Sequence, residues 1–199
     1  MTQRRWGDQQ SPIDIVHPIQ AQLGDLALAY QPTPLRILND GLTVQVNHAP
    51  GSRLTIRGHT YEVVSFHFHT PSEHRVDGRE YAMELHIVHE DSEAELAVLG
   101  VFLDFGGTNE ALEPILSALP VKKTPETAVA GVNVDIRRLL PVSMVYYEYI
   151  GSRTMPPYKE SVRWLVLREP ISVSETQVAR FKEAFPMNAR PLQPVIASA

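Results

Sequence analysis

Short apolar stretches separated by turns dominate the chain. Residues 42–47 and 53–57 alternate apolar and polar side chains, as half-buried strands do. Residues 61–69 and 81–89 are rich in β-branched and aromatic side chains, and 96–105 is almost wholly apolar, as in a strand buried on both faces. Two further runs predict strands at 143–150 and 162–168. Strands at this spacing predict a mainly β fold.

Two segments carry the signals of helices that pack on the surface of a sheet. Asn109 is placed to cap a helix over 110–119, in which the leucines and the isoleucine fall on one face. Ser174 opens a Ser-x-x-Gln capping box ahead of a helix over 175–185. A short helical turn is expected at 135–140, before a proline.

Composition limits the class of protein. The 199 residues predict a single domain, 1–199, with an ordinary globular mix of 43% apolar and 21% charged residues. The net charge of −5 and the lack of a basic run argue against nucleic acid or an anionic membrane as a partner. No apolar run is long enough for a transmembrane helix. The start of the chain lacks the apolar core of a signal peptide, so the sequence as it stands predicts a cytoplasmic protein, or a periplasmic or secreted one whose leader has been removed.

Cysteine is absent, and histidine is concentrated instead. Without cysteine there is no disulfide, thiolate metal site, iron–sulfur cluster or cysteine nucleophile, so any metal site must use histidines and carboxylates. Successive strand residues point to opposite faces, so His67 and His69 share one face while Phe66 and Phe68 turn into a core. Of the eight histidines, five lie within 23 residues: His67, His69, His74, His86 and His89.

The next predicted strand adds a third histidine in phase. His86 shares a face with Glu84, whereas Leu85 and Ile87 face the other way. If residues 71–78 connect the two strands as a loop, the imidazoles of His67, His69 and His86 converge. Three histidines without a fourth protein ligand are typical of a catalytic zinc, which keeps one position for water. Imidazole also suits copper, iron and nickel.

Neighbouring polar residues could support such a metal. Glu84 could accept an imidazole N–H and raise the basicity of that ligand. Glu73 and His74 follow His69 closely and could orient whatever binds the metal. The alternative is that these histidines are ordinary residues of a half-buried sheet, but the phased cluster with acidic neighbours favours the metal site.

Seven motifs occur along the chain in the order typical of one enzyme family. They are QSPIDI at 10–15, FHFHTPSEH at 66–74, ELHIVH at 84–89, LAVLGVFL at 96–103, YIGSRTMPP at 149–157, WLVLREPI at 164–171 and NARP at 188–191. Together they resemble the α-class carbonic anhydrases, and the resemblance runs from about residue 10 to residue 194. The short connection from His69 to Glu73 is similar to that of the bacterial branch.

The resemblance implies a fold and a reaction. The fold is a large, mostly antiparallel, twisted central sheet of about ten strands with a few short surface helices. The reaction is the reversible hydration of carbon dioxide to bicarbonate and a proton, catalysed by a zinc lyase. The implied partners are therefore Zn²⁺ and the small-molecule substrate, in a monomer or homodimer that binds neither nucleic acid nor membrane.

The resemblance also assigns roles to residues. His67, His69 and His86 match the zinc ligands, and Glu73 and Thr154 match the pair that orients the zinc-bound hydroxide. The substrate pocket is matched by Val88, Val98, Arg153, Val162 and Trp164. The positions that support the metal ligands are matched by Ser65, His74, Glu84 and Tyr149.

One departure from the family concerns proton transfer. The family segment Asn-x-Gly-His often ends in a histidine that carries protons to buffer, and here Leu42 stands in its place. An aliphatic side chain cannot relay a proton, so the resemblance implies an enzyme without a histidine shuttle. The other unassigned histidines have no position in the sequence that ties them to the cleft: His17, His48, His59 and His89.

Other departures affect the pocket and the ends of the chain. Ser65 replaces a glutamine that commonly bonds the first zinc ligand, Arg153 replaces an apolar residue at the pocket mouth, and Met155 replaces a threonine. Arg5 and Tyr158 stand near the places of a cysteine pair that secreted bacterial members usually carry.

Two other functions are compatible with such a sequence. One is a carbonic-anhydrase-like binding domain without catalysis, although such relatives normally lose a zinc ligand and this chain keeps all three histidines. The other is a zinc hydrolase of esters.

Overall fold

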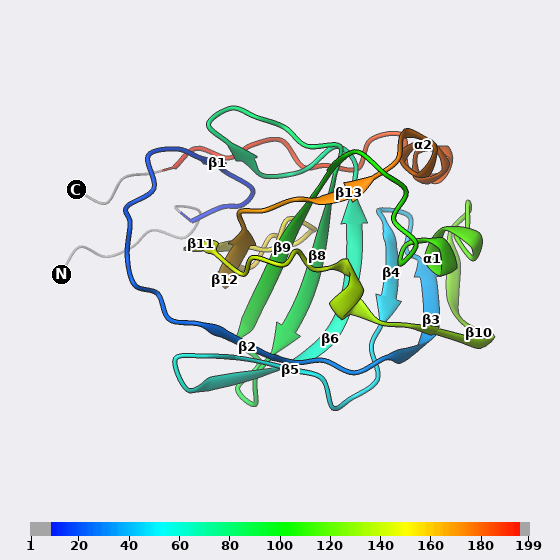
Figure 1. Cartoon of the computed structure of the whole chain (residues 1–199), viewed down its shortest axis with the longest axis horizontal. Coiled ribbons are helices and arrows are strands. Elements are labelled where there is room, and N and C mark those ends of the chain that lie inside the picture. Colours follow the sequence, from blue (N-terminus) through cyan, green and yellow to red (C-terminus); the bar gives the residue numbers. More distant parts are fainter. Residues whose placement is uncertain (1–8, 196–199) are drawn as a thin grey trace.

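A computed structural model describes residues 9–195 and shows an eleven-stranded sheet with helices at its margins (Figure 1). The strands are β1 (Asp14–Ile15), β2 (Leu26–Ala29), β3 (Thr33–Asn39), β4 (Val44–Asn47), β5 (Arg53–Ile56), β6 (His59–His69), β7 (Arg75–Val76), β8 (Met83–Glu90), β9 (Leu96–Phe105), β10 (Thr124–Val134), β11 (Tyr146–Ser152), β12 (Glu160–Leu167) and β13 (Ile171–Val173). The helices are α1 (Glu113–Ser117), the 3₁₀ turn η1 (Ile136–Leu139) and α2 (Glu175–Ala184).

The sheet is mostly antiparallel, as predicted. Its order is β10-β3-β4-β6-β8-β9-β12-β11, with β13 beside β9 and the β2–β5 pair joined to β6. Only the pairings of β9 with β12 and with β13 are parallel within this sheet. A separate two-stranded parallel sheet joins β1 to β7. The long strands β6, β8 and β9 therefore lie side by side at the centre, where both faces can be covered (Figure 1).

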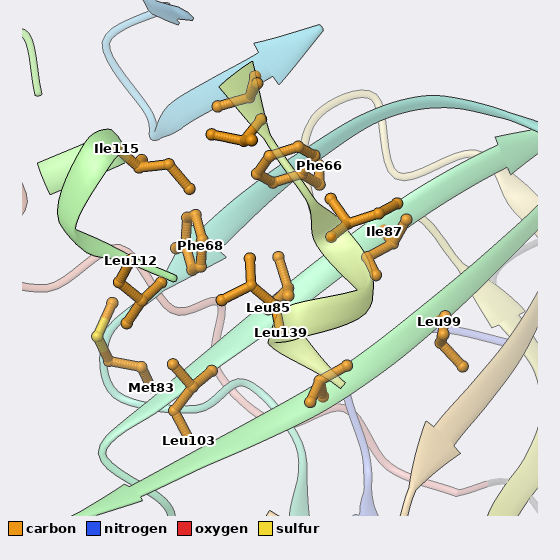
Figure 2. Close-up of a cluster of buried hydrophobic side chains, with 14 of the residues drawn as sticks. Phe66, Phe68, Met83, Leu85, Ile87, Leu99, Leu103, Leu112, Ile115 and Leu139 are labelled. Carbon is orange, nitrogen blue, oxygen red and sulfur yellow. The ribbon is translucent and has the colours of Figure 1, made fainter. Parts of the chain in front are cut away.

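Alternate side chains of the central strands pack into two separate hydrophobic cores. Phe66, Phe68, Leu85 and Ile87 belong to the larger core, where side chains from α1 and η1 close over them (Figure 2). The smaller core, on the other side of the sheet, contains Val98, Phe102, Val162, Trp164 and Val166. His67, His69 and His86 occupy the intervening positions, so they face away from the larger core.

The predicted strands are present with small differences in their ends, and two longer strands were missed. β10 is an edge strand whose side chains are mostly exposed and whose register shifts, so it lacks the alternation that identifies a half-buried strand. The second residue of β3 is Pro34, and a proline argues against a strand when only the sequence is considered.

One predicted helix was correct and the other was too long. α2 has the predicted capping box, in which Ser174 Oγ accepts from the Gln177 backbone N–H at 3.3 Å. α1 begins only at Glu113, and Asn109 does not cap it; the Asn109 carboxamide accepts instead from the Ala111 N–H in a preceding turn. η1 forms the expected helical turn. Among residues 9–195, no helix has the length and apolar character needed to cross a bilayer.

Candidate active site

The register of two central strands brings the three histidines together. β6 pairs with β8 so that His67 lies opposite His86, and His69 lies opposite Glu84. All three imidazoles are buried, and each offers a nitrogen within 4.8 Å of the others. The ring centroids of His69 and His86 are 4.7 Å apart, and those of His67 and His86 are 5.2 Å apart. The convergence expected from the alternation of the strands is thus present.

The hydrogen bonds of these rings leave nitrogens unused. His69 Nδ1 donates to the Asn188 carbonyl at 3.1 Å, which leaves its buried Nε2 without a partner. His86 Nε2 lies 3.0 Å from Glu84 Oε1 but is not aligned for a hydrogen bond. Both nitrogens of His67 lack partners among the described residues, so Ser65 does not replace the glutamine contact. Buried imidazole nitrogens without partners are costly unless they bind something, and this donor set suits a divalent metal such as zinc.

Burial also disfavours protonation of the first two histidines. It lowers the pKa of His67 well below its usual value, and the charges of His69, His86 and Arg153 lower it further. Burial lowers the pKa of His69 as well. Both rings are therefore neutral at neutral pH, the form in which imidazole binds metals.

A second group of potential ligands shares His86 but is already internally bonded. His74, Glu84 and His86 also present atoms within 4.8 Å of one another. His74 Nδ1, however, donates to Glu84 Oε1 at 2.7 Å, and Glu84 Oε2 accepts the backbone N–H groups of Glu73 and His74. Because these atoms satisfy one another, the triad of His67, His69 and His86 is the favoured metal site.

A buried chain of hydrogen bonds supports the site from behind. With its Nδ1 donating to Glu84, His74 accepts at Nε2 from the Tyr149 hydroxyl at 2.6 Å, and that hydroxyl bonds Ser11 Oγ at 2.7 Å. Burial raises the pKa of Glu84, but the charges of His74 and His86 and the hydrogen bond from His74 outweigh burial and hold the pKa of Glu84 well below its usual range. Burial raises the pKa of Tyr149 well above its usual value, so Tyr149 remains a neutral donor.

Glu73 and Thr154 both lie at the site but are not bonded to each other. Glu73 Oε1 accepts the Arg190 backbone N–H at 2.8 Å, and its buried Oε2 has no partner among the described residues. Thr154 is 7% exposed and lines a pocket together with His67 and His86. The free oxygen of Glu73 is therefore an available acceptor for a hydroxyl donor.

A small pocket next to the histidines is largely apolar. Trp164 is held in its wall by an Nε1–H bond to the Ser152 carbonyl at 2.9 Å, and its ring lies against His86. Val162 is not part of the lining; it packs in the core behind it. The lining residues are His67, His86, Val88, Leu96, Val98, Arg153, Thr154, Met155 and Trp164.

A second cavity of about 410 Å³ opens on the other side of Thr154. It contains Leu42, which is 51% exposed, together with His69 and Met155. Tyr158 also lines it, with the Arg190 guanidinium 3.8 Å above the tyrosine ring. Tyr158 stands near the place of one cysteine of the pair that secreted bacterial members usually carry. Arg5, which stands near the place of the other cysteine, lies outside the described residues.

Sequence reasoning overlooked some residues that hold the site. Asn188 and Arg190 support His69 and Glu73 through main-chain groups, and Ser11 ends the buried chain at Tyr149. Each of the three lies in one of the motifs that support the family resemblance. Membership in those motifs was the signal in the sequence that could have identified them. Leu96 lines the pocket two residues before Val98, on the same face of β9.

The fold and the site define a protein with a three-histidine, metal-compatible pocket on a mostly antiparallel sheet. A family model described as "Eukaryotic-type carbonic anhydrase" matches residues 2–195. The chain belongs to this family, the α-class carbonic anhydrases, as the sequence motifs predicted. The family and its curated relatives assign it to the carbonic anhydrases, enzymes that hydrate carbon dioxide.

Relatives and solved structures agree with this assignment. A carbonic anhydrase from Nostoc is 43% identical over 194 residues, 95% of this chain and 74% of the relative. The α-carbonic anhydrase of Thermovibrio ammonificans, in a complex with sulfanilamide, superposes with a TM-score of 0.92 at 36% identity over 96% of this chain and 85% of that one. Dioscorin complexed with ascorbate also matches, with a TM-score of 0.87 at 33% identity over 95% and 83%.

Proposed function

We propose that this protein catalyses the zinc-dependent, reversible hydration of carbon dioxide to bicarbonate and a proton, without a histidine proton shuttle. The observation that carries the proposal is the convergence of His67, His69 and His86 as buried imidazoles with unpartnered nitrogens. When bound there, zinc would lower the pKa of a coordinated water to about 7 and so supply a nucleophile at neutral pH.

Each histidine has a nitrogen suited to the metal. His69 is oriented by its Nδ1 bond to Asn188, so Nε2 is the ligand atom. His86 places Nε2 against Glu84, so we assign Nδ1 as its ligand atom. His67 has no such orienting bond, and the metal itself would fix its ring. The anionic Glu84 increases the electron density on the imidazole that it contacts, which strengthens that ligand.

Glu73 and Thr154 are proposed to orient the nucleophile. We propose that the Thr154 hydroxyl donates to Oε2 of Glu73, which has no partner among the described residues. The Thr154 oxygen can then only accept a hydrogen bond from the attacking oxygen, so a lone pair of that oxygen is directed at the carbon. The Thr154 backbone N–H is the proposed donor to one substrate oxygen.

The apolar wall is proposed to hold carbon dioxide. Val88, Val98 and Trp164 line the pocket beside the histidines, and Val162 supports the wall from the core. An apolar linear molecule needs no polar partner there, and the surrounding side chains exclude competing water.

The proton must leave by another route than a histidine at position 42. Leu42 lines the cavity beside His69, and no histidine besides His67, His69 and His86 lines either of the two cavities in the described part of the chain. Buffer molecules would therefore enter the open cavity and collect the proton themselves.

Metal analysis combined with stopped-flow carbon dioxide hydration tests this function. We expect about one zinc per chain and rapid hydration, both lost in His67→Ala, His69→Ala and His86→Ala. Bound zinc without hydration would support a non-catalytic binding domain instead. Ester hydrolysis without hydration of carbon dioxide would support a zinc hydrolase.

A further inference from the structure

An arginine at the mouth of the substrate pocket distinguishes this chain. Arg153 lines the same pocket as His67, His86 and Trp164, although its side chain is exposed to solvent. Apart from the two histidines, the other residues that line this pocket have apolar side chains or, in Thr154, a hydroxyl group. A fixed positive charge therefore stands beside a low-dielectric wall, where its attraction for an anion is stronger than in open water.

Among residues 9–195, the guanidinium of Arg153 has no ion pair and no hydrogen bond. None of the ion pairs among residues 9–195 includes it, whereas most of the other arginines there are paired with carboxylates. Arg190, which lines the neighbouring cavity, is committed to Gln10 and to the Ser11 carbonyl. Arg153 is thus the available cationic group at this pocket.

The backbone of Arg153 is held in place while its side chain remains available. Its N–H donates to the Lys159 carbonyl at 2.8 Å, and its own carbonyl accepts from the buried Ser152 hydroxyl at 2.8 Å. The side chain therefore starts from a fixed point directly beside Thr154. A guanidinium presents parallel N–H donors that match the two oxygens of a carboxylate-like anion and stays charged at every relevant pH.

We propose that Arg153 forms a binding site for bicarbonate at the mouth of the substrate pocket, so that the enzyme distinguishes its anionic substrate from its neutral one. This inference rests on the proposed function. Carbon dioxide carries no charge and gains little from Arg153. Bicarbonate and other small monovalent anions gain a charge-assisted contact, so Arg153 acts on the affinity for the anion.

The test is anion binding to the Co²⁺-substituted enzyme, followed by its visible absorption during titration with bicarbonate and, separately, with thiocyanate. Replacing the charge with the apolar residue usual in the family, in Arg153→Leu, should raise the Kd of both anions roughly 5- to 10-fold, the scale of one partly exposed charged contact. Arg153→Lys keeps the charge but loses the parallel N–H donors, so its Kd values should lie between those of the wild type and Arg153→Leu.

A matched control removes the same charge elsewhere. Arg138 is an exposed arginine of η1, which covers the opposite face of the sheet, and Arg138→Leu should leave the anion Kd values unchanged. Equal Kd values in wild type and Arg153→Leu would overturn the inference, as would an equal loss in Arg138→Leu. Failure of the proposed function would look different: the wild type itself would lack metal or hydration.

Discussion

Glu84 accepts the Nδ1 hydrogen of His74 at 2.7 Å, in a place where neither side chain is exposed to solvent. The same carboxylate oxygen lies 3.0 Å from His86 Nε2, so one buried acid connects the hydrogen-bond chain behind the site to a proposed metal ligand. The acid stays ionised because the two imidazoles compensate for its burial. Its role is therefore to position and strengthen His86.

This arrangement predicts a moderate loss of metal affinity on changing Glu84. Glu84→Gln keeps the volume but turns an amide N–H₂ toward donors that need an acceptor. We expect zinc affinity to fall roughly 10- to 100-fold, measured by competition with a chelator. His86→Ala, the comparison variant, should lose most of its zinc. Normal zinc occupancy in His86→Ala would show that the third ligand is a different residue.

The proposed orienting pair predicts a loss of rate without a loss of metal. Thr154→Val keeps the shape of the side chain and removes the hydroxyl that would donate to Glu73. Turnover should fall roughly 10²-fold, the scale of one preorganised polar contact, while zinc content is unchanged. Thr154→Ser keeps the hydroxyl and should retain most of the activity. Wild-type rates in Thr154→Val would remove Thr154 from the mechanism.

Leu42 predicts that proton removal limits turnover. At saturating carbon dioxide, we expect the rate to rise steeply with buffer concentration, and more with small imidazole buffers than with bulky ones. Leu42→His should raise turnover at low buffer and flatten this dependence, because its imidazole has a pKa near 6.5. The value of kcat/KM for carbon dioxide should stay nearly constant, since hydration and proton removal are separate steps. A high, buffer-independent wild-type rate would mean that another group carries the proton.

A different histidine predicts a pH dependence of stability. His89 is fully buried, and burial lowers its pKa to about 4, although its ring bonds the Tyr30 hydroxyl and the Ala97 carbonyl. Between pH 6.5 and 4 the unfolded chain binds a proton here and the folded chain does not, so stability falls as the pH falls. At pH 5 this amounts to about 2 kcal/mol.

The measurement is urea unfolding at pH 7.5 and pH 5 for the wild type and for His89→Asn, both loaded with zinc. Asparagine is neutral at both pH values, so the variant should lose about 2 kcal/mol less than the wild type on acidification. The same pH sensitivity in both proteins would assign the effect to other groups.

A glycine packed behind the site predicts a stability defect. A Cβ added at Gly151 would lie 2.7 Å from the Tyr149 ring and also collide with Ser11 Oγ, so Gly151→Ala must displace residues of the buried chain. We expect a loss of about 1–3 kcal/mol in the free energy of unfolding, with weaker zinc binding. Gly107→Ala is the control, because a Cβ there meets no atom within 4 Å. Equal stability of the two variants would show that Tyr149 and Ser11 can relax without cost.

The sequence by itself determined the class of fold and the histidine triad. Period-two alternation assigned Phe66 and Phe68 to one face of a strand and His67 and His69 to the other, because successive strand residues must point to opposite sides. It also placed Glu84 in phase with His86. These are local consequences of backbone geometry, and long motifs in family order added the identity of the enzyme class.

Only the tertiary structure decided which groups are paired and which remain free. The register that sets His67 opposite His86, the main-chain contacts from Asn188 and Arg190, and the unpartnered Oε2 of Glu73 all depend on segments distant in sequence. The long edge strand β10 likewise follows from its pairing with β3, since its exposed side chains leave no periodic signal. The alternation of apolar and polar residues indicates which face of a strand a residue occupies. The hydrogen-bond partners of a residue depend on which distant segments of the chain pack beside it.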